Sequence, residues 1–127
     1  MAKKASDIKL GVIDDNVQTA VSITQLLEFN GFKTFQAYNA KDAVAKAKKE
    51  KPDLLILDIK LGFGETGYDV AKELPKQKIL FISGYDMDKN KIKSFSNVIG
   101  SLTKPVDINE LLKLIRKKFN VPEPKEI

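Results

Sequence analysis

Five polar residues could do chemistry together, because each stands at the end of a short apolar run. They are Asp14 and Asp15 after "IKLGVI", Asp58 after "DLLIL", Ser83 at the end of "KILFIS" and Lys104 after "VIGSLT". If the three carboxylates converge, each pair repels by about 4 kcal/mol at roughly 4 Å, so they would raise one another's pKa or recruit a cation. Mg²⁺ suits such a site, since it binds oxygen ligands and keeps waters for a phosphoryl group. One carboxylate could then accept a phosphoryl group, helped by the lysine and the hydroxyl.

The composition narrows the possible chemistry. The 127 residues contain no cysteine and no histidine, which excludes thiol chemistry, cysteine metal sites and an imidazole base or phosphoryl carrier in this chain. The net charge of +5 comes from lysine-rich stretches with helical spacing, such as "KDAVAKAKKEK" and "KLIRKKF". Such stretches are typical of solvated helix faces, so we expect no direct contact with nucleic acid.

Short apolar runs alternate with helical patterns along the chain. We expect strands at 8–13, 32–38, 53–57, 78–83 and 98–103, and helices at 17–29, 39–50, 68–74, 87–95 and 107–119. The apolar stripe of the first helix runs through Val17, Ala20, Val21, Thr24 and Leu27. The alternation predicts an α/β domain with a five-stranded parallel sheet between helices. In the strand order 2-1-3-4-5, the polar strand ends lie on neighbouring strands, at the edge where such folds bind ligands.

The extent of the domain follows from the same patterns. No repeat or linker interrupts residues 7–120, so we expect residues 1–120 to form a single domain. Residues 121–127, "VPEPKEI", have the composition of a tail or the stub of a linker. No apolar run reaches the roughly 18 residues of a membrane span, and the N-terminus lacks an apolar signal region. We therefore expect a cytoplasmic protein with no membrane partner.

Four motifs, in this order along the chain, together resemble the receiver domain of two-component response regulators, of the chemotaxis-regulator type. They are "GVIDDN", "DLLILDIKL", "ILFISGY" and "SLTKPVD", and the resemblance covers residues 7–120. It implies a flavodoxin-like (βα)5 fold with a doubly wound sheet in the order 2-1-3-4-5. It also implies a phosphoryl-accepting signalling domain, which is no enzyme beyond catalysing its own phosphorylation and dephosphorylation.

The resemblance further implies a role for each strand-end residue. Asp58 would accept the phosphoryl group, Ser83 would be the switch hydroxyl, and Lys104 would pair with Asp58 and later with its phosphate. The peptide bond from Lys104 to Pro105 would be cis. Mg²⁺ would be held by Asp15, Asp58, the backbone carbonyl of Lys60 and, through a water, Asp14. The phosphoryl donor would be a sensor histidine kinase or a histidine phosphotransfer protein, and the output a downstream protein or an output domain outside these residues.

Three features depart from the family pattern. Ser101 stands where many receivers have an aromatic residue that turns inward on activation, so switching is expected to rely on Ser83 and the "GYDMDKN" segment that follows it. Gly62 stands where proline is common, and the three glycines within 62–67 predict a flexible loop that Mg²⁺ or phosphorylation orders. Gly67 lies one position late and only 16 residues before Ser83, which predicts a short third helix.

Other functions stay open on the sequence alone. The fold could serve as a receiver-like interaction module that is not phosphorylated. An aspartyl-phosphate phosphatase of the haloacid dehalogenase kind would need an aspartate two residues after its nucleophile, where Lys60 stands. The side chains of Lys60 and Tyr85 could border the site and control access of water, or simply face solvent. Whether phosphorylation causes dimerisation is also open.

Overall fold

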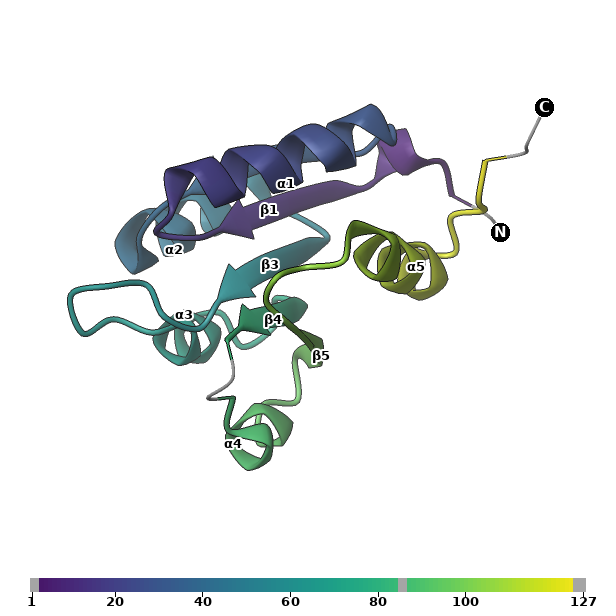
Figure 1. Cartoon of the computed structure of the whole chain (residues 1–127). Helices are drawn as coiled ribbons and strands as arrows, with labels where there is room; N and C mark the ends of the chain where they lie inside the picture. Colours follow the sequence, from purple (N-terminus) through teal and green to yellow (C-terminus); the bar gives the residue numbers. More distant parts are fainter. Residues whose placement is uncertain (1–2, 85–86, 125–127) are drawn as a thin grey trace.

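The computed structural model describes residues 3–84 and 87–124. Its centre is one parallel sheet in the order β2-β1-β3-β4-β5 (Figure 1), as the sequence predicted. The strands are β1 (Lys9–Ile13), β2 (Lys33–Ala37), β3 (Leu54–Asp58), β4 (Ile79–Ser83) and β5 (Val98–Thr103). The register pairs Ile13 of β1 with Leu57 of β3. The next residues, Asp14 and Asp58, therefore stand side by side at the carboxyl edge of the sheet.

Helices connect the strands, and side-chain caps set where most of them begin. A short 3-10 helix (Ala5–Asp7) precedes β1, and the α-helices are α1 (Val17–Phe29), α2 (Ala40–Glu50), α3 (Gly67–Glu73), α4 (Lys89–Lys93) and α5 (Ile108–Phe119). The residue before each α-helix accepts a backbone N–H of the first turn, which stabilises the helix start; these caps are Asn16, Asn39, Thr66, Asp88 and Asp107. α3 is short, as predicted, and α4 is shorter than the expected 87–95 because Asp88 is its cap.

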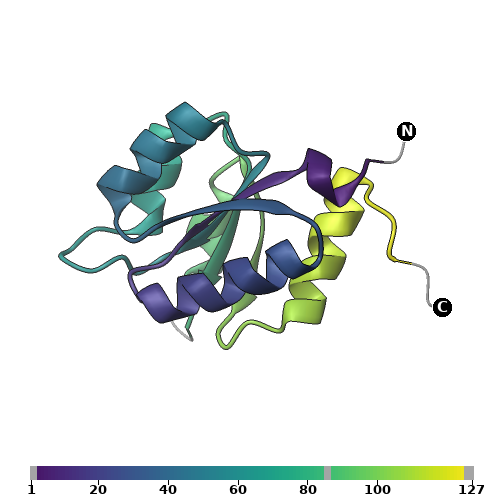
Figure 2. The same cartoon turned by 90° about the horizontal axis from the view of Figure 1, so that it is seen from above.

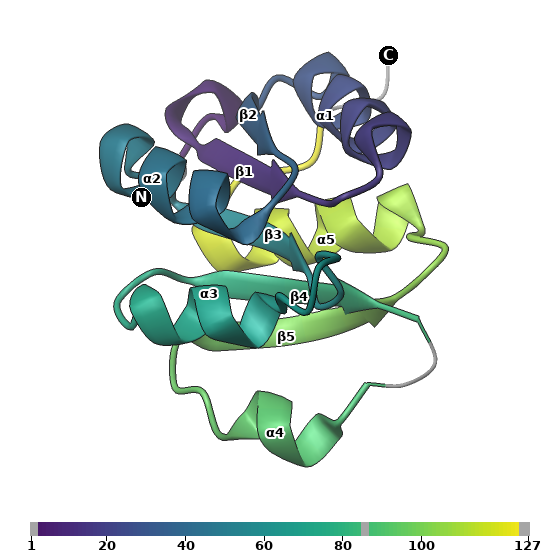
Figure 3. The ribbon, with the colours of Figure 1, turned by 90° about the vertical axis from the view of Figure 1, so that its left-hand side faces the viewer.

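Two layers of helices cover the sheet (Figures 2 and 3). α1 and α5 pack on one face, and α2, α3 and α4 pack on the other, each layer over its own apolar core. Every position of β3 and β4 is buried, as expected for central strands of a parallel sheet with helices on both faces. These two strands form the fixed base that carries Asp58 and Ser83.

The buried stripe of α1 differs in part from the prediction. The residues that α1 buries are Ala20, Ile23, Thr24 and Leu27. Val17 is instead 51% exposed, because the first turn of α1 extends past the end of β1, where no strand lies beneath it (Figure 1). The stripe keeps its helical period but begins one turn later than the sequence indicated.

The chain stays packed against the domain just beyond the end of α5. Val121 is buried in the core shared by α1 and α5, and its amide donates a hydrogen bond to the carbonyl of Arg116. The backbone amide of Lys3 donates to the carbonyl of Asn120, which joins the two ends of the described chain. Val121, expected in the tail, thus packs with the domain. None of the helices in the described ranges has the length and apolar character needed to cross a membrane.

Candidate functional site

The ends of four neighbouring strands bring the predicted site residues together. Asp14 follows β1, Asp58 ends β3, Ser83 ends β4 and Lys104 follows β5. Asp14, Asp58 and Ser83 are buried, with exposed fractions of 3%, 5% and 4%. Asp15 is exposed at the rim. Buried polar side chains at one edge of a sheet indicate a built site, because burying a polar group without partners destabilises the fold.

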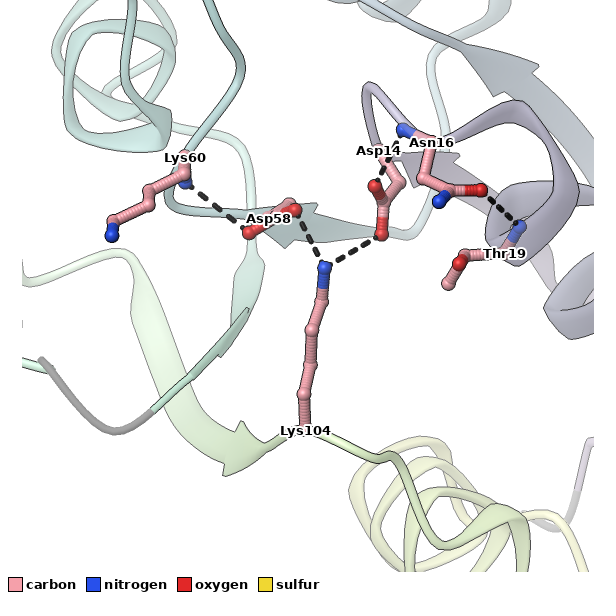
Figure 4. A network of polar contacts seen from close by, with 6 residues as sticks. All are labelled: Asp14, Asn16, Thr19, Asp58, Lys60 and Lys104. Atoms are coloured by element: carbon pink, nitrogen blue, oxygen red, sulfur yellow. Dashed lines mark hydrogen bonds and ion pairs between the residues drawn. The ribbon is translucent and has the colours of Figure 1, made fainter.

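Lys104 bridges two of the carboxylates (Figure 4). Its Nζ lies 2.7 Å from Oδ2 of Asp58 and 3.0 Å from Oδ2 of Asp14, and its side chain is one-third exposed. The backbone amide of Lys104 donates to the carbonyl of Ser83 over 2.7 Å, and this bond holds the backbone of Lys104 in place beside β4. The following Lys104–Pro105 bond is cis, as predicted. The pairing with Asp58 was expected, whereas the pairing with Asp14 was not.

The ammonium of Lys104 is held in its charged form. Burial alone would lower the pKa of Lys104, but the hydrogen bonds and negative charges of Asp58 and Asp14 outweigh it and raise this pKa above the ordinary lysine value. Because the pKa of Lys104 is higher in the folded than in the unfolded state, its charge stabilises the fold, and this contribution is fully present at pH values below the unfolded pKa of about 10.4. That stabilisation is lost only as the pH rises through the raised value, so Lys104 is a fixed positive charge at neutral pH.

Asp14, Asp15 and Asp58 form one acidic cluster. Carboxylate oxygens of all three lie within 4.8 Å of one another. Two backbone amides orient them: the N–H of Asn16 donates to Oδ1 of Asp14 over 2.9 Å, and the N–H of Lys60 donates to Oδ1 of Asp58 over 3.2 Å (Figure 4). With three carboxylates and the single ammonium of Lys104, the cluster retains an excess of two negative charges, which favours binding of a cation.

Comparison with known proteins identifies this arrangement. A family model described as the response regulator receiver domain matches residues 10–116. The chain belongs to the response regulator receiver domain family. Together with the sheet order, this confirms the predicted flavodoxin-like fold and the predicted class of function.

Relatives of this receiver domain differ in length. PilH of Pseudomonas aeruginosa is 31% identical over 111 residues, which cover 82% of this chain and 91% of PilH. The alkaline phosphatase synthesis transcriptional regulatory protein PhoP of Bacillus subtilis is 30% identical over 126 residues, but the chain spans only 51% of its length. A solved CheY-like receiver domain from Methanospirillum hungatei is 28% identical, with a TM-score of 0.77 over 89% of this chain and 94% of that one.

The acidic cluster of this receiver domain fits a magnesium ion. Its side-chain donors are all carboxylate oxygens, which are hard ligands that Mg²⁺ prefers, and it offers no nitrogen or sulfur ligand that would favour a transition metal. Lys60 reaches Asp58 through its backbone, while its side chain points away from Asp58 (Figure 4). The position two residues after Asp58 thus offers no second acid, which removes support from the phosphatase alternative.

The loop after Asp58, which was expected to be flexible because of its glycines, forms a hydrogen-bonded hairpin. Lys60 and Thr66 pair across it, Leu61 N–H donates to the carbonyl of Glu65 over 3.2 Å, and Glu65 N–H donates to the carbonyl of Gly62 over 3.0 Å. The carboxylate of Glu65 also accepts the backbone N–H of Ala40 at the start of α2. Gly62 and Gly64 supply positive φ angles of 77° and 76° for the tight turn. Further ordering of the loop by Mg²⁺ stays a prediction.

Gly67 fixes the start of α3 against β3. Its amide donates to the carbonyl of Ile59 over 2.7 Å. A Cβ at this position would lie 2.6 Å from the backbone oxygen of Asp58 and 3.1 Å from the ring of Phe81. Glycine is therefore required by the close approach of the helix to β3.

An aromatic cluster that the sequence did not reveal lies between α3, β4 and the end of α4. The rings of Tyr68 and Phe95 stack with centroids 5.9 Å apart, and Phe81 meets both edge-on. Lys91 Nζ lies 4.4 Å from the centre of the Tyr68 ring. Burial is the main cause of the raised pKa of Tyr68, and a hydrogen bond from the Asp88 backbone acts against it. The cluster ties α4 to α3 and to β4.

Ser101 and Tyr85 were singled out in the sequence for their place near the site. Ser101 lies half-buried in β5, paired with Phe81 of β4, so the position that often carries an aromatic residue in the family holds a small hydroxyl. Tyr85 lies outside the described residues.

Proposed function

We propose that this receiver domain accepts a phosphoryl group on Asp58 from a phosphohistidine donor in a Mg²⁺-dependent reaction. The observation that carries the proposal is the pairing of Lys104 with both Asp58 and Asp14 beside an exposed Asp15. This pairing places a fixed positive charge between two buried carboxylates at the carboxyl edge of the sheet, closest to that of Asp58. Phosphorylation then alters the charge at Asp58 and shifts an existing equilibrium between two conformations of a binding surface.

The transfer step needs no acid or base from this chain. An oxygen of Asp58 forms a bond to phosphorus, the bond from phosphorus to the donor imidazole nitrogen breaks, and the imidazole keeps the electron pair. Lys104 is placed to pair with a phosphoryl oxygen without moving far, since it already lies 2.7 Å from Asp58. Ser83 is the last residue of the neighbouring strand β4, and its buried hydroxyl can donate a hydrogen bond to another phosphoryl oxygen.

Asp14, Asp15 and Asp58 would hold the magnesium ion, with the backbone carbonyl of Lys60 as a further ligand. When bound, Mg²⁺ supplies the positive charge that offsets the repulsion between these carboxylates and the incoming phosphoryl group. The donor class follows from composition: the 127 residues hold no histidine, so the phosphohistidine lies elsewhere. We assign it to a sensor histidine kinase or a histidine phosphotransfer protein, and the output to a downstream protein or domain.

Residues 1–120 act in this proposal as a single receiver domain, extended by the buried Val121. The match to nearly the whole of PilH suits a receiver that works through a separate protein. The match to half of PhoP suits one that is joined to an output domain. The proposed reaction is the same in both cases.

Incubation with acetyl phosphate and Mg²⁺ is expected to add one phosphoryl group to the wild-type domain, observed as an intact-mass increase. Chelating Mg²⁺ should reduce the labelling by at least about tenfold, because the repulsion between the carboxylates and the phosphate then goes uncompensated. Asp58→Asn, which keeps the shape of the side chain but removes the nucleophile, should not be labelled. Unlabelled wild-type protein would instead favour an interaction module that is not phosphorylated.

Ser83→Ala is expected to leave labelling by acetyl phosphate within about threefold of wild type while removing most of the conformational response. The hydroxyl lies at the end of β4, and the segment that follows it leads to α4, so it can pass the change at Asp58 to that helix. Amide chemical shifts of residues 87–95, measured before and after phosphorylation, report this response. Shift changes as large as those of wild type would contradict the role of Ser83.

A further inference from the structure

Phe63 is an exposed aromatic residue at the tip of the hairpin that follows Asp58. Its side chain is fully exposed, and its backbone adopts a φ of 54°. A residue with a Cβ is disfavoured in this left-handed region, and a bulky aromatic residue is a clear exception there. Single exposed apolar side chains are common on protein surfaces, but a strained backbone that presents one beside a reactive group points to a function.

The hairpin holds Phe63 on a short and well-supported base. Gly62 and Gly64 on either side also have positive φ angles, and hydrogen bonds between Gly62, Leu61 and Glu65 close the turn. The Glu65 carboxylate anchors the hairpin to the start of α2. A side chain presented by a rigid loop loses little conformational freedom when it is buried by a partner, and this favours binding.

The hairpin stands at the rim of the acidic cluster. A Cβ placed on Gly62 would lie 3.5 Å from Oδ2 of Asp15, so the residue before Phe63 packs against the cluster. The loop between β3 and α3 projects past the ends of the strands in two perpendicular views (Figures 1 and 2). Asp58 itself is recessed, with 5% of its surface exposed. A histidine carried by a protein must therefore be brought over this rim to reach Asp58, whereas a small phosphoryl donor need not touch the hairpin.

We propose that Phe63 is a docking anchor for the protein that carries the donor phosphohistidine, inserting into an apolar pocket on that protein beside its histidine. The inference rests on the proposed function of Asp58. Aromatic side chains dominate the binding energy of protein interfaces when a pocket on the partner surrounds them. The neighbouring polar hairpin and the acidic cluster would form the rim of the contact.

The test compares a protein donor with a small-molecule donor. Wild-type protein is screened against the phosphorylated histidine kinase and phosphotransfer domains of the source organism, and the fastest donor is kept. Phe63→Ala should raise KM for that donor about tenfold or more, with kcat unchanged, while labelling by acetyl phosphate keeps its wild-type rate. Phe63→Asn should behave in the same way, since asparagine tolerates a positive φ and removes only the apolar ring.

Phe29→Ala is the matched control. Phe29 is 89% exposed but lies at the far end of α1, about 20 Å along the helix from its start near Asp15. This variant should transfer as wild type does, and an equal loss would overturn the proposal by pointing to non-specific apolar adhesion.

Other outcomes also decide the question. Unchanged transfer in both Phe63 variants would overturn the proposed anchor. So would a wild-type protein that is labelled by acetyl phosphate but by none of the protein donors. If the Phe63 variants changed the rate of labelling by acetyl phosphate, or of dephosphorylation afterwards, as much as transfer from the protein donor, the proposal would also be overturned. Phe63 would then act by covering Asp58. Failure of acetyl phosphate to label wild-type Asp58 would instead refute the proposed function and, with it, the basis of this inference.

Discussion

Replacing Lys104 with methionine is expected to lower the free energy of unfolding by about 2 kcal/mol when no Mg²⁺ is present. The substitution removes the ammonium between Asp58 and Asp14, at 2.7 Å and 3.0 Å, and leaves two buried carboxylates without their shared cation. Breaking a fully buried ion pair can cost about 3–5 kcal/mol. The expected effect is smaller because the side chain of Lys104 is 32% exposed, so water screens part of the interaction.

Mg²⁺ should reverse much of this loss. A cation bound by the acidic cluster stabilises the folded state by an amount that grows with the logarithm of its affinity, and the cluster is more negative once Lys104 is gone. In saturating Mg²⁺ we expect the difference between Lys104→Met and wild type to fall below about 1 kcal/mol. Urea unfolding curves with Mg²⁺ and with a chelator measure both quantities.

Lys113→Met provides the control for removing a lysine charge. Lys113 is exposed on α5. We expect this variant to stay within about 0.5 kcal/mol of wild type in either condition. If Lys104→Met were as stable as wild type in the chelator, Lys104 could not be the charge that compensates Asp58 and Asp14.

Replacing Gly67 with alanine is expected to destabilise the domain by about 2–3 kcal/mol. The added methyl would lie 2.6 Å from the backbone oxygen of Asp58 and 3.2 Å from Cα of Ile59. Backbone atoms cannot rotate away as a side chain can, so α3 and the end of β3 have to move apart. The same movement displaces Asp58, and we expect labelling by acetyl phosphate to slow by at least about tenfold.

Gly84→Ala separates this close approach from a general effect of losing glycine. A Cβ on Gly84 meets no atom within 4 Å among the described residues, so the free energy of unfolding of Gly84→Ala should differ from wild type by less than about 1 kcal/mol. Thermal or urea unfolding and the rate of mass increase with acetyl phosphate give the two readouts. A Gly67→Ala domain with wild-type stability would mean that α3 does not pack on Asp58 as closely as described.

The loop after Asp58 illustrates where sequence reasoning reached its limit. The glycines of "GFGETG" were interpreted as a source of flexibility, but Gly62 and Gly64 serve a hydrogen-bonded turn, and Gly67 serves a close contact with β3. Glycine permits unusual backbone angles and close approach as well as disorder, and composition alone does not distinguish these uses. Which of these uses applies depends on the contacts of the loop with distant residues. Ala40, whose backbone N–H donates a hydrogen bond to Glu65, lies 25 residues away in the chain.

Residue patterns alone predicted the parallel sheet and the residues that meet at its carboxyl edge, and the resemblance to receiver domains implied the strand order. This worked because Asp14, Asp58, Ser83 and Lys104 each end an apolar run, and parallel strands place such ends on one edge. The predicted helix starts at 39 and 107 fall on the observed caps Asn39 and Asp107, because a helix start depends on a few adjacent residues.

The way in which these elements meet became visible only in the folded chain. It paired Lys104 with Asp14 across 90 residues, gathered Tyr68, Phe81 and Phe95 into one cluster, and left Val17 exposed on a helix turn beyond the sheet. Periodicity shows which face of an element is apolar, but it does not show how far a helix extends past its strand or which side chain reaches across. Those features depend on packing between segments distant in sequence, where the relative position of whole elements sets each contact.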